Sequence, residues 1–559
     1  MARANHQITN FLSGELSPFL NGRSDTDRFQ NALKTCENFT IKPYGGAQRR
    51  PGSYFVAEVK NSAKKVRLIR FEFSRAQSYI LEFGDQYMRF YTQNGRIESG
   101  GSPVELATPY TEAQLDDIQV AQSADVLYIV HNSHNPRKLA RVSNTSWTLT
   151  DVSFTAPKWD ATDGYPTAVT FHQQRLWFGG TTAKPQTIFA SKTDNFENFT
   201  IGTGDDDALE YQIASYKVNR VQWMSSTEVL IIGTSGGEFK VSGGTAALTP
   251  SNVQVTRQTS YGGLNKQPRH VGYQTLFIDG TGTKIRSYEY TWSQDVYESE
   301  DLAFLAEHIT TGGIKEMAYQ AVPDGIIWSI RNDGVLLGMT YDKARGVIGW
   351  HRHTTDGEYE SVASIPQATT DEVWVAVKRT IGGATKRYVE YLSPNINVDC
   401  GLTYSGSATA SISGLNHLEG KTVQVRGDDS VYPDQVISSG AITLPSTVSK
   451  ADIGLKYTST LETLPVEAGN PAGTAQGRKK RWNEIWVRLH DSFNPKVNDI
   501  MPPVRSPSTG MGVPEPRTTG DVRIHDTGYD YSGSIKVTQD LPGPTHILSI
   551  FGTISVSSG

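Results

Sequence analysis

The 559-residue sequence contains little cysteine, no long apolar run and no strong excess of either charge. Its two cysteines, Cys36 and Cys400, are too few for a disulfide framework or a multi-thiolate metal site, so we expect both to be buried and inert. No segment approaches the roughly 18 apolar residues of a membrane span, and the first residues contain no continuous apolar core of a secretory signal. We therefore expect a protein that is made in the cytoplasm and does not insert into a membrane.

The charge balance argues against a strongly basic nucleic-acid clamp, because 53 Lys and Arg residues face 58 Asp and Glu residues for a net charge of -5. Apolar residues make up 37% of the chain and charged residues 20%, which is typical of a globular protein. Glycine (52), proline (26), tyrosine (25) and phenylalanine (20) are abundant. Such a composition favours many short strands joined by turns, and hence an all-β fold.

A short pattern recurs seven times along the first 400 residues. Each copy has a polar or small lead-in followed by a β-branched and aromatic run, as in Gln174–Gly179. The first apolar residues of the copies are 47 to 53 residues apart: Tyr79, Val126, Leu176, Val229, Leu276, Ile326 and Val373. Four short strands with their turns need about 40 to 50 residues, the length of one propeller blade. The spacing predicts a β-propeller of about seven blades; a stack of β-sandwiches is the alternative.

The runs have apolar residues on both faces, which suits inner strands packed between neighbouring blades. Segments between them alternate apolar and polar residues, including Tyr87–Thr92 and Lys284–Tyr290. A period of two is typical of half-buried strands, so we assign these segments to outer strands. The sixth unit predicts a hairpin of Ile326–Arg331 and Val335–Tyr341, joined by a turn at residues 332–334.

The two ends of the chain differ from the repeat. The spacing of Phe29, Leu33 and Cys36 predicts a helix over residues 26–38. The last strands, residues 533–539 and 546–557, are expected to pair with residues 484–489. The predicted regions are an N-terminal arm and docking segment (1–60), the propeller-like repeat domain (61–396), a small β-sandwich-like domain with a basic linker (397–497), and a proline-rich loop with closing strands (498–559).

Reactive side chains form no catalytic or metal-binding motif. Carboxylates occur as neighbours at residues 116–117, 205–207 and 428–429, but adjacent residues of a strand face opposite sides, so we expect solvated turn acids. The histidine pairs His131/His134 and His351/His353 lack a third ligand pattern, which favours polar surface. We therefore predict no enzyme, no catalytic residues, no cofactor and no metal.

Two basic clusters remain as candidate contacts with phosphates or with an acidic partner surface, a solvated loop being the equal alternative. They are Arg49 and Arg50, in a glycine- and proline-rich stretch, and Arg478, Lys479, Lys480 and Arg481, at the end of the basic linker. The second cluster is the stronger candidate, because four consecutive cations repel one another unless something screens them. We treat all six residues as candidate interface or channel contacts.

Several short motifs, taken together and in order, resemble a family of tail proteins of short-tailed bacteriophages, the stabilisation, nozzle or tail hub proteins. The motifs are FLSGELSP at residues 11–18, CENFT at 36–40, GGAQRRPG at 45–52, FHQQRLWF at 171–178, PQTIF at 185–189, FENF at 196–199, GLNHLEGK at 414–421 and GTAQGR at 473–478. They span nearly the whole chain. None has an obvious catalytic meaning, so the specificity lies in their order and number.

The resemblance implies a structural protein of the virion tail, a hexameric tube or nozzle below the portal and its adaptor ring. It also implies that double-stranded DNA leaves the capsid through this tube, without sequence-specific binding, and that tail fibres or spikes dock outside. A mildly acidic chain suits such a conduit, because a neutral or negative wall does not grip moving phosphates. We expect an acidic or neutral bore, with the basic clusters serving subunit contacts or a local brake.

Two other functions are compatible with a propeller. A carbohydrate-binding or carbohydrate-degrading propeller acting on the host surface would need two carboxylates facing one pocket, about 5 to 9.5 Å apart. A cellular scaffold of the repeat type is the other alternative, although no regular tryptophan–aspartate signature occurs in the blades.

Overall fold

The structure is a computed structural model that describes residues 2–156, 159–214, 219–467, 474–503, 505, 513–525 and 528–557. Strands dominate this part of the chain, which confirms the predicted all-β class. Its helical elements are short: η1 (Pro18–Leu20), η2 (Phe29–Asn31), η3 (Glu112–Asp117), η4 (Phe304–Ala306), α1 (Glu307–Thr310), η5 (Lys343–Arg345) and η6 (Asn416–Leu418). Among the described residues, no helix has the length and apolar character that a membrane crossing requires.

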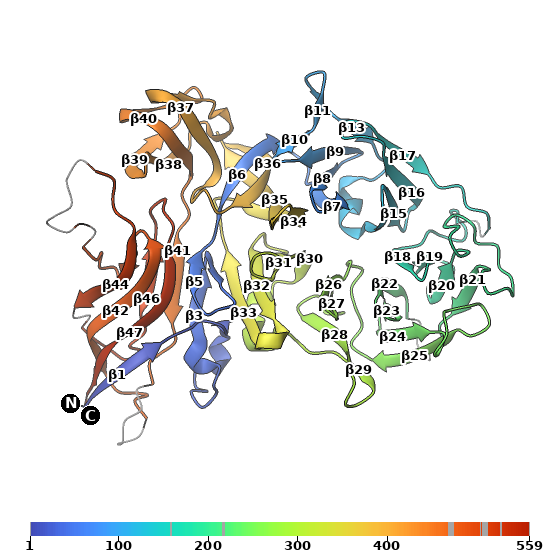
Figure 1. The fold of residues 1–559 in the computed structure, drawn as a ribbon, viewed down its shortest axis with the longest axis horizontal. Helices are drawn as coiled ribbons and strands as arrows, with labels where there is room; N and C mark the ends of the chain where they lie inside the picture. Colours follow the sequence, from blue (N-terminus) through green and yellow to red (C-terminus); the bar gives the residue numbers. More distant parts are fainter. Residues whose placement is uncertain are drawn as a thin grey trace.

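In the described part of the chain, seven antiparallel sheets follow one another around a ring and form a β-propeller (Figure 1). Blade 1 consists of β7 (Arg67–Ser74), β8 (Gln77–Gly84) and β9 (Tyr87–Thr92), with β10 (Gly95–Arg96) and β13 (Glu105–Ala107) alongside β9. Blade 2 consists of β14 (Gln119–Ser123), β15 (Val126–His131), β16 (His134–Arg141) and β17 (Trp147–Asp151). Blade 3 consists of β18 (Ala168–His172), β19 (Arg175–Gly179), β20 (Thr187–Ala190) and β21 (Leu209–Gln212). A small hairpin of β11 (Glu98–Ser99) and β12 (Ser102–Pro103) projects from blade 1.

The ring continues through four more blades in chain order. Blade 4 consists of β22 (Val221–Ser226), β23 (Leu230–Thr234), β24 (Gly237–Ser242) and β25 (Gln254–Thr259), and blade 5 of β26 (Arg269–Val271), β27 (Gln274–Ile278), β28 (Ile285–Thr291) and β29 (Val296–Glu298). Blade 6 consists of β30 (Ile314–Gln320), β31 (Ile326–Arg331), β32 (Leu336–Asp342) and β33 (Val347–His353). Blade 7 consists of β34 (Glu358–Gln367), β35 (Thr370–Ile381), β36 (Ala384–Ser393) and β6 (Gly52–Glu58).

The seven repeated runs are the second strands of the seven blades: β8, β15, β19, β23, β27, β31 and β35. All five residues of β23 are buried, as expected for a strand packed between two blades. The repeat therefore predicted both the propeller and its blade number, and the ring excludes the stack of sandwiches. The predicted hairpin of the sixth unit is β31 paired with β32.

The ring is closed by a strand from the N-terminal region. Strand β6 pairs antiparallel with β36, with Tyr54 opposite Tyr391, and forms the fourth strand of blade 7. Residues 52–58 therefore belong to the propeller, although the sequence placed them in an N-terminal arm. Pairing of the first and last parts of a ring holds it closed through backbone hydrogen bonds rather than side-chain contacts alone.

Blades 6 and 7 do not end at their fourth strands. The sheet of blade 6 continues to nine strands through β2 (Gly14–Glu15), β3 (Ala32–Glu37), β41 (Ser459–Thr463), β46 (Lys536–Gln539) and β43 (Lys496–Val497). The sheet of blade 7 continues to eight strands through β37 (Asp399–Ser413), β40 (Ala441–Leu455), β38 (Thr422–Gly427) and β39 (Ser430–Val436). We call blades 6 and 7 the anchored blades.

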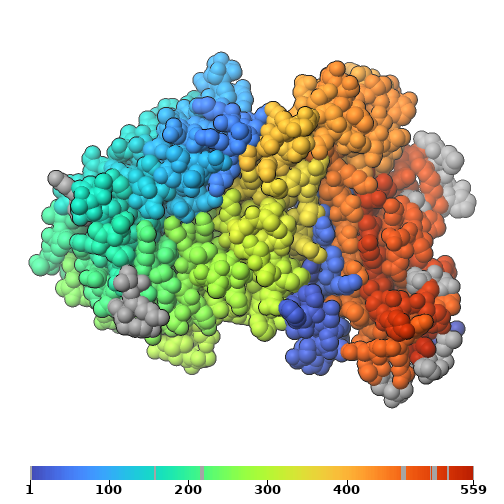
Figure 2. All heavy atoms as spheres, turned by 180° about the vertical axis from the view of Figure 1, so that it is seen from behind, coloured from blue at the N-terminus to red at the C-terminus, as the bar shows by residue number. Residues whose placement is uncertain are grey.

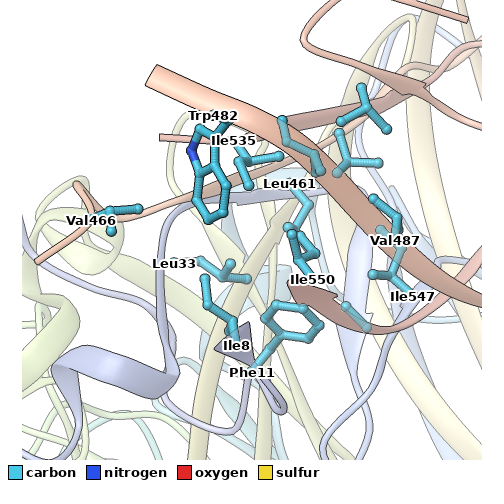
Figure 3. Close-up of a cluster of buried hydrophobic side chains, with 14 of the residues drawn as sticks. Ile8, Phe11, Leu33, Leu461, Val466, Trp482, Val487, Ile535, Ile547 and Ile550 are labelled. Carbon is cyan, nitrogen blue, oxygen red and sulfur yellow. The ribbon is translucent and has the colours of Figure 1, made fainter. Parts of the chain in front are cut away.

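A third sheet packs against the far end of the blade 6 sheet and completes a C-terminal sandwich. It contains β4 (Phe39–Ile41), β5 (Ala47–Arg49), β47 (His546–Val556), β42 (Lys480–Ser492) and β44 (Thr518–His525), with β1 (Ala2–Ile8) and β45 (Tyr529–Asp530) alongside. Its core joins both ends of the chain, because Ile8, Phe11 and Leu33 pack with Trp482 and Ile550 (Figure 3). A sandwich is present, but not with the predicted bounds of 397–497: residues 399–455 extend the sheet of blade 7, and the sandwich is built from N-terminal strands together with strands after residue 458.

Two predictions about the ends are wrong in part. The helix expected over residues 26–38 is instead η2 followed by β3, because β3 pairs with β41, more than 400 residues away, and with β2. Strand β47 pairs with β42 as expected, with Thr553 opposite Glu484, whereas β46 pairs with β41 and β43. Residues 504 and 506–512 of the predicted proline-rich loop, and residues 468–473 of the basic linker, lie outside the described residues.

Candidate functional site at the junction of the propeller and the C-terminal sandwich

Arg49 and Arg50 lie where β5 of the sandwich leads into β6 of the propeller. Their exposed fractions are 2% and 0%, so both guanidinium groups are inside the chain. A charged group is buried only where ion pairs or hydrogen bonds replace its water. The expectation that these two arginines contact a partner or DNA is therefore wrong, and their partners explain why they are buried.

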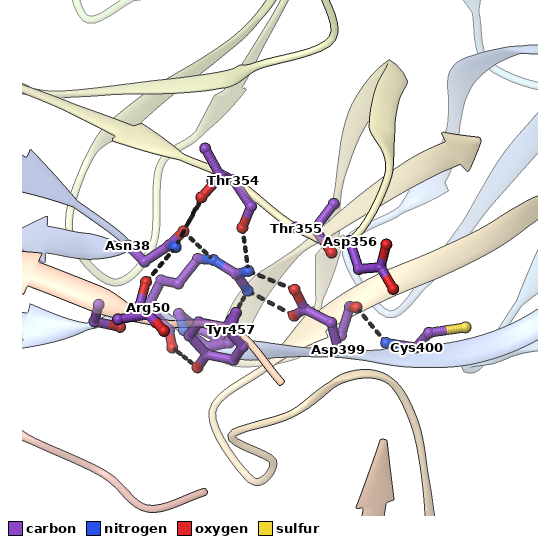
Figure 4. A network of polar contacts seen from close by, with 12 residues as sticks. Asn38, Arg50, Thr354, Thr355, Asp356, Asp399, Cys400 and Tyr457 are labelled. Carbon is purple, nitrogen blue, oxygen red and sulfur yellow. Dashed lines mark hydrogen bonds and ion pairs between the residues drawn. The ribbon is translucent and has the colours of Figure 1, made fainter. Parts of the chain in front are cut away.

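Arg50 makes a bidentate ion pair with Asp399 at the start of β37 (Figure 4). Its Nη1 donates to Asp399 Oδ1 at 2.8 Å and its Nη2 to Asp399 Oδ2 at 2.6 Å. The other donors are used as well, because Nε donates to Asn38 Oδ1 and Nη2 to the Thr354 carbonyl oxygen, both at 2.9 Å. One side chain thus connects the sandwich, the link between blades 6 and 7, and the extension of blade 7.

Among the described residues, Arg49 donates only to neutral groups. Its Nε donates to Ser459 Oγ at 3.2 Å, its Nη2 to the Tyr457 carbonyl oxygen at 2.9 Å, and its Nη1 to the carbonyl oxygens of Gly543 and Leu541. Both guanidinium groups pack on the ring of Tyr457, at 4.3 Å for Arg49 and 3.8 Å for Arg50. Such cation–π contacts strengthen where water is excluded.

The electrostatics of the two arginines differ because only Arg50 has a carboxylate. Burial and the neighbouring cation of Arg50 lower the pKa of Arg49. Burial also opposes the charge of Arg50, but Asp399 outweighs it and raises the pKa of Arg50; in return Arg50 lowers the pKa of Asp399 against the effect of burial. The pair is therefore ionised throughout the neutral pH range.

A second fully buried ion pair lies beside the first. Arg379 Nε and Glu390 Oε1 are 2.8 Å apart, and both side chains are 0% exposed. Ser53 joins the two regions, since its Oγ donates to Glu390 at 2.5 Å and accepts from the Cys400 backbone N–H at 2.9 Å. Cys36 and Cys400 are both free and buried, as expected, and burial raises the pKa of each thiol.

The first two family-like motifs meet at a third buried charge. Glu15, 1% exposed, accepts from the Cys36 backbone N–H at 2.7 Å and from Arg352 Nε at 3.2 Å, and it lies 2.9 Å from His308 Nε2. Asn38 of the second motif holds Arg50, as described above. Sequence reasoning quoted Glu15 and Asn38 within motifs but assigned them no role, because their partners lie far away in the chain.

The basic run at residues 478–481 leads into a strand, since its last two residues, Lys480 and Arg481, are the first residues of β42. Lys480 is 2% exposed, its Nζ donates to the Tyr531 carbonyl oxygen at 2.9 Å, and burial lowers its pKa. Lys479 Nζ lies 5.6 Å from the ring of Tyr531, and the Arg481 guanidinium lies 5.7 Å from the ring of Tyr529. Lys479, just before the strand, is the exposed member, and strand alternation separates only Lys480 and Arg481.

A cavity of about 450 Å³ opens between the anchored blades and the sandwich. Asp324, Asp371 and Glu372 line it, and each is engaged: Lys42 Nζ is 2.6 Å from Asp324, the Ala321 backbone N–H donates to Asp371 at 2.7 Å, and Trp374 Nε1 donates to Glu372. Burial raises the pKa of Glu372. The cavity brings carboxylates together, which the sequence did not indicate, but all three hold protein groups.

A second cavity, of about 460 Å³, lies on the propeller axis and is lined by the first strand of every blade.

The remaining reactive groups identified in the sequence lie apart from both cavities. Lys65 pairs with Asp116 at 2.8 Å, and Lys192 with Asp207 at 2.7 Å, so these turn acids are partly paired rather than simply solvated.

The histidine pairs differ in their environment. His351 and His353 are both 0% exposed, and His351 Nδ1 lies 2.7 Å from His353 Nε2, so the expectation of polar surface is wrong for this pair. Burial lowers the pKa of His351 to about 3. The expectation is also wrong for His131, which is 2% exposed and whose pKa burial lowers to about 4, whereas its partner His134 is half-buried and bonds Gln114 at 3.0 Å. Among the described residues, no three His, Cys, Asp or Glu side chains are grouped to hold a metal.

Comparisons with known proteins find similarity at the level of architecture. No protein-family model and no curated protein matches the sequence. One similar solved structure is that of the WD40 repeats of RRP9, with a TM-score of 0.39 and 8% sequence identity; the match covers 62% of this chain and 100% of that one. Another is the β-propeller domain of Cps50 (Swd1) from Myceliophteria thermophila, with a TM-score of 0.37 and 9% identity; the match covers 60% of this chain and 99% of that one. The structure of U3-55K has a TM-score of 0.37 and 9% identity, and the match covers 61% of this chain and 100% of that one.

Proposed function

We propose that this chain is a structural subunit of a short bacteriophage tail. In this proposal, copies form a ring or tube below the portal and adaptor, which retains double-stranded DNA and conducts it during ejection, and which offers docking sites for fibres or spikes. The ordered motifs quoted above support it, and so does one structural observation. Blades 6 and 7 run into the C-terminal module as continuous nine- and eight-stranded sheets.

Continuous sheets make the propeller and the sandwich one stiff body. Backbone hydrogen bonds cross the boundary at β33, β2 and β3 on one side and at β6 and β37 on the other. Space-filling atoms of the anchored blades lie directly against N-terminal and C-terminal residues, whereas blades 2 to 5 lie at the other end of the molecule (Figure 2). A wall subunit that must keep its shape while DNA moves past benefits from such stiffness.

Exposed aromatic residues offer a surface for subunit contact. Phe19 of η1 is 85% exposed and Phe304 of η4 is 67% exposed. The two segments are adjacent, because the Ser17 backbone N–H donates to the Leu305 carbonyl oxygen at 2.8 Å. Large apolar side chains gathered on a surface favour contact with another protein. We propose this Phe19/Phe304 patch as a contact between neighbouring subunits of the ring.

The basic residues bear on the DNA part of the proposal. Arg49, Arg50 and Lys480 have their charges inside the chain, so the exposed Lys479 is the member best placed for a contact outside it. We expect a Lys479→Gln variant to leave ejection intact, because a conduit that releases DNA quickly does not need a cationic grip. Abolished ejection by a correctly assembled variant tail would contradict the acidic or neutral bore.

The experiment that tests the proposal is native mass spectrometry with negative-stain microscopy, with and without the cognate adaptor ring. A six-membered ring, alone or with the adaptor, is expected. A double variant, Phe19→Ser with Phe304→Ser, should remain folded and lose the ring, whereas Trp292→Ser, 85% exposed elsewhere, should keep it. A persistent monomer that ignores the adaptor and releases glycans from host surfaces would favour the carbohydrate-active alternative.

A further inference from the structure

The cavity on the propeller axis has the size of a small-molecule site. Its volume of about 460 Å³ falls within the roughly 300 to 1,000 Å³ of typical ligand pockets. All seven blades contribute a lining residue from their first strand: Arg67, Val120, Phe171, Met224, Arg269, Glu316 and Ser364. A site built by every blade is held rigidly by the whole ring.

The lining of this axial cavity is positively charged. Three arginines line it, Arg67, Arg70 and Arg269, whereas Glu316 is the one carboxylate among the described residues that line it. Glu316 is already committed to Arg67, whose Nε lies 2.9 Å away, and it also accepts from Ser361 Oγ at 2.6 Å. The remaining two guanidinium groups must find other anions.

Arg70 has a carboxylate at the edge of the cavity, since its Nη2 lies 2.6 Å from Glu72. The charge of Arg67 is matched by Glu316, and its Nη1 also donates to the carbonyl oxygens of Leu115 and Ile118 at 2.8 and 2.7 Å. One positive charge of the three is therefore left without a matching carboxylate at the cavity. That charge belongs to Arg269.

Arg269 makes one hydrogen bond to the protein, from Nε to the Met317 carbonyl oxygen at 2.8 Å. No ion pair joins it to a carboxylate in the described part of the chain, and its two terminal nitrogens donate to no acceptor among those residues. Burial and the nearby cations of Arg70 and Arg67 lower its pKa. Arg269 is only half-buried and a guanidinium stays charged at neutral pH, so its charge is available to an anion that enters the cavity.

We propose that the axial cavity binds a small oxyanion, with Arg269 as its main ligand and Arg70 assisting. The planar fork of a guanidinium matches two oxygens of a phosphate or sulfate group, and such charge-assisted hydrogen bonds are the strong ones. The occupant is a free anion or a small phosphorylated molecule, since the volume admits no nucleic-acid duplex. Binding takes place within one chain and is independent of the proposed ring.

Isothermal titration of the full chain with inorganic phosphate tests the site, with sodium chloride adjusted to constant ionic strength. We expect one saturable site per chain, and Arg269→Gln should weaken it by roughly tenfold to a hundredfold. Arg70→Gln should weaken it by a smaller factor, because the carboxylate of Glu72 is then left unpaired near the site. Arg75→Gln is the control, since Arg75 does not line the cavity: its Nε donates to the Ala368 carbonyl oxygen, its Nη2 lies 3.8 Å from Asp371, and its side chain is 57% exposed.

Thermal unfolding gives a second readout. Phosphate should raise the melting temperature of the wild-type chain in a concentration-dependent way. Without phosphate, Arg269→Gln should be at least as stable as the wild type, because an unmatched cation has been removed. Absence of saturable binding by the wild type, or equal binding by the wild type and Arg269→Gln, overturns the proposal. Should Arg269→Gln fail to fold, unchanged phosphate binding by Arg70→Gln overturns it instead.

Discussion

The anchored blades and the blades opposite them are built on the same four-stranded plan but hold their charges differently. Blades 2 to 5 are separate four-stranded sheets, and their ion pairs lie at the surface, as between Lys184 and Glu210, 51% and 24% exposed. The anchored blades continue into the C-terminal module, and at this boundary Arg50 with Asp399 and Arg379 with Glu390 are fully buried.

The difference shows what a junction demands of a sequence. Burying an ion pair costs desolvation, and hydrophobic residues of similar volume often stabilise as well or better. A guanidinium, however, can bind several loop carbonyls at once, which an apolar side chain cannot do. Arg50 reaches Asn38 and Thr354, which follow β3 and β33 of the blade 6 sheet, and Asp399 of the blade 7 sheet, so one side chain joins the two sheets. The junction therefore exchanges some stability for a fixed geometry.

The largest effect is expected when this pair is broken on one side. Arg50→Met leaves Asp399 buried without its cation, and such losses cost about 3 to 5 kcal/mol. Urea unfolding followed by tryptophan fluorescence measures the change. If Arg50→Met lowered the free energy of unfolding by only about 0 to 1 kcal/mol, as expected for an exposed ion pair, the contacts at the junction would not contribute as proposed.

A smaller effect is expected from crowding the strand that closes the ring. A Cβ at Gly52 would lie 2.7 Å from the Ile396 carbonyl oxygen and closer still to the backbone of Val398. Gly52→Ala should therefore cost about 1 to 3 kcal/mol, because β6 has to move away from its neighbours. Urea unfolding measures the change. The same titration of Gly346→Ala, where the Cβ meets nothing within 4 Å but φ is +68°, separates crowding from backbone strain.

Acid should weaken the anchored side through its buried histidines. Burial lowers the pKa of His351 to about 3 and that of His353 well below its ordinary value, so the unfolded chain binds more protons as the pH falls below 6.5. Their contribution is fully present above pH 6.5 and is lost towards pH 3, at about 1 kcal/mol per histidine per pH unit below pH 6. His353→Gln should flatten the pH dependence of the unfolding free energy, whereas His525→Gln, at an exposed position, should leave it unchanged.

The smallest effect is expected at the opposite blades. Lys184→Met removes the exposed pair with Glu210 in blade 3, and we expect a change of about 0 to 1 kcal/mol. The measurement is the same urea titration as for Arg50→Met. A loss as large as that of Arg50→Met would remove the distinction between the two sides of the ring.

The repeated runs predicted the ring because each run records a local environment. A strand packed between two blades is apolar on both faces whatever its partners are, so residues such as Leu176 and Val373 mark it directly. The strand β3 left no such mark. The spacing of Phe29, Leu33 and Cys36 also fits a helix. Leu33 and Cys36 lie in a strand because they pair with β41, and the local sequence gives no sign of that pairing.

The junction was hidden for the same reason. Two adjacent arginines in a glycine- and proline-rich stretch look like a solvated loop. Their partners Asp399 and Tyr457 are 349 and 407 residues further along the chain. The role of Arg269 could not be predicted either, because the sequence does not show that the first strands of all seven blades meet around one axis. Positions whose role depends on such distant contacts can be recognised only in the folded chain.

Hydrogen–deuterium exchange of the full chain tests most directly the central claim, that propeller and sandwich form one stiff body. The amides of β41 and β46, at the far end of the blade 6 sheet, should open only with those of β31 and β32, and so show the same free energy of opening. Exchange of β41 and β46 at a much lower free energy, while β31 and β32 stay protected, would show that the sandwich opens by itself and would contradict the account.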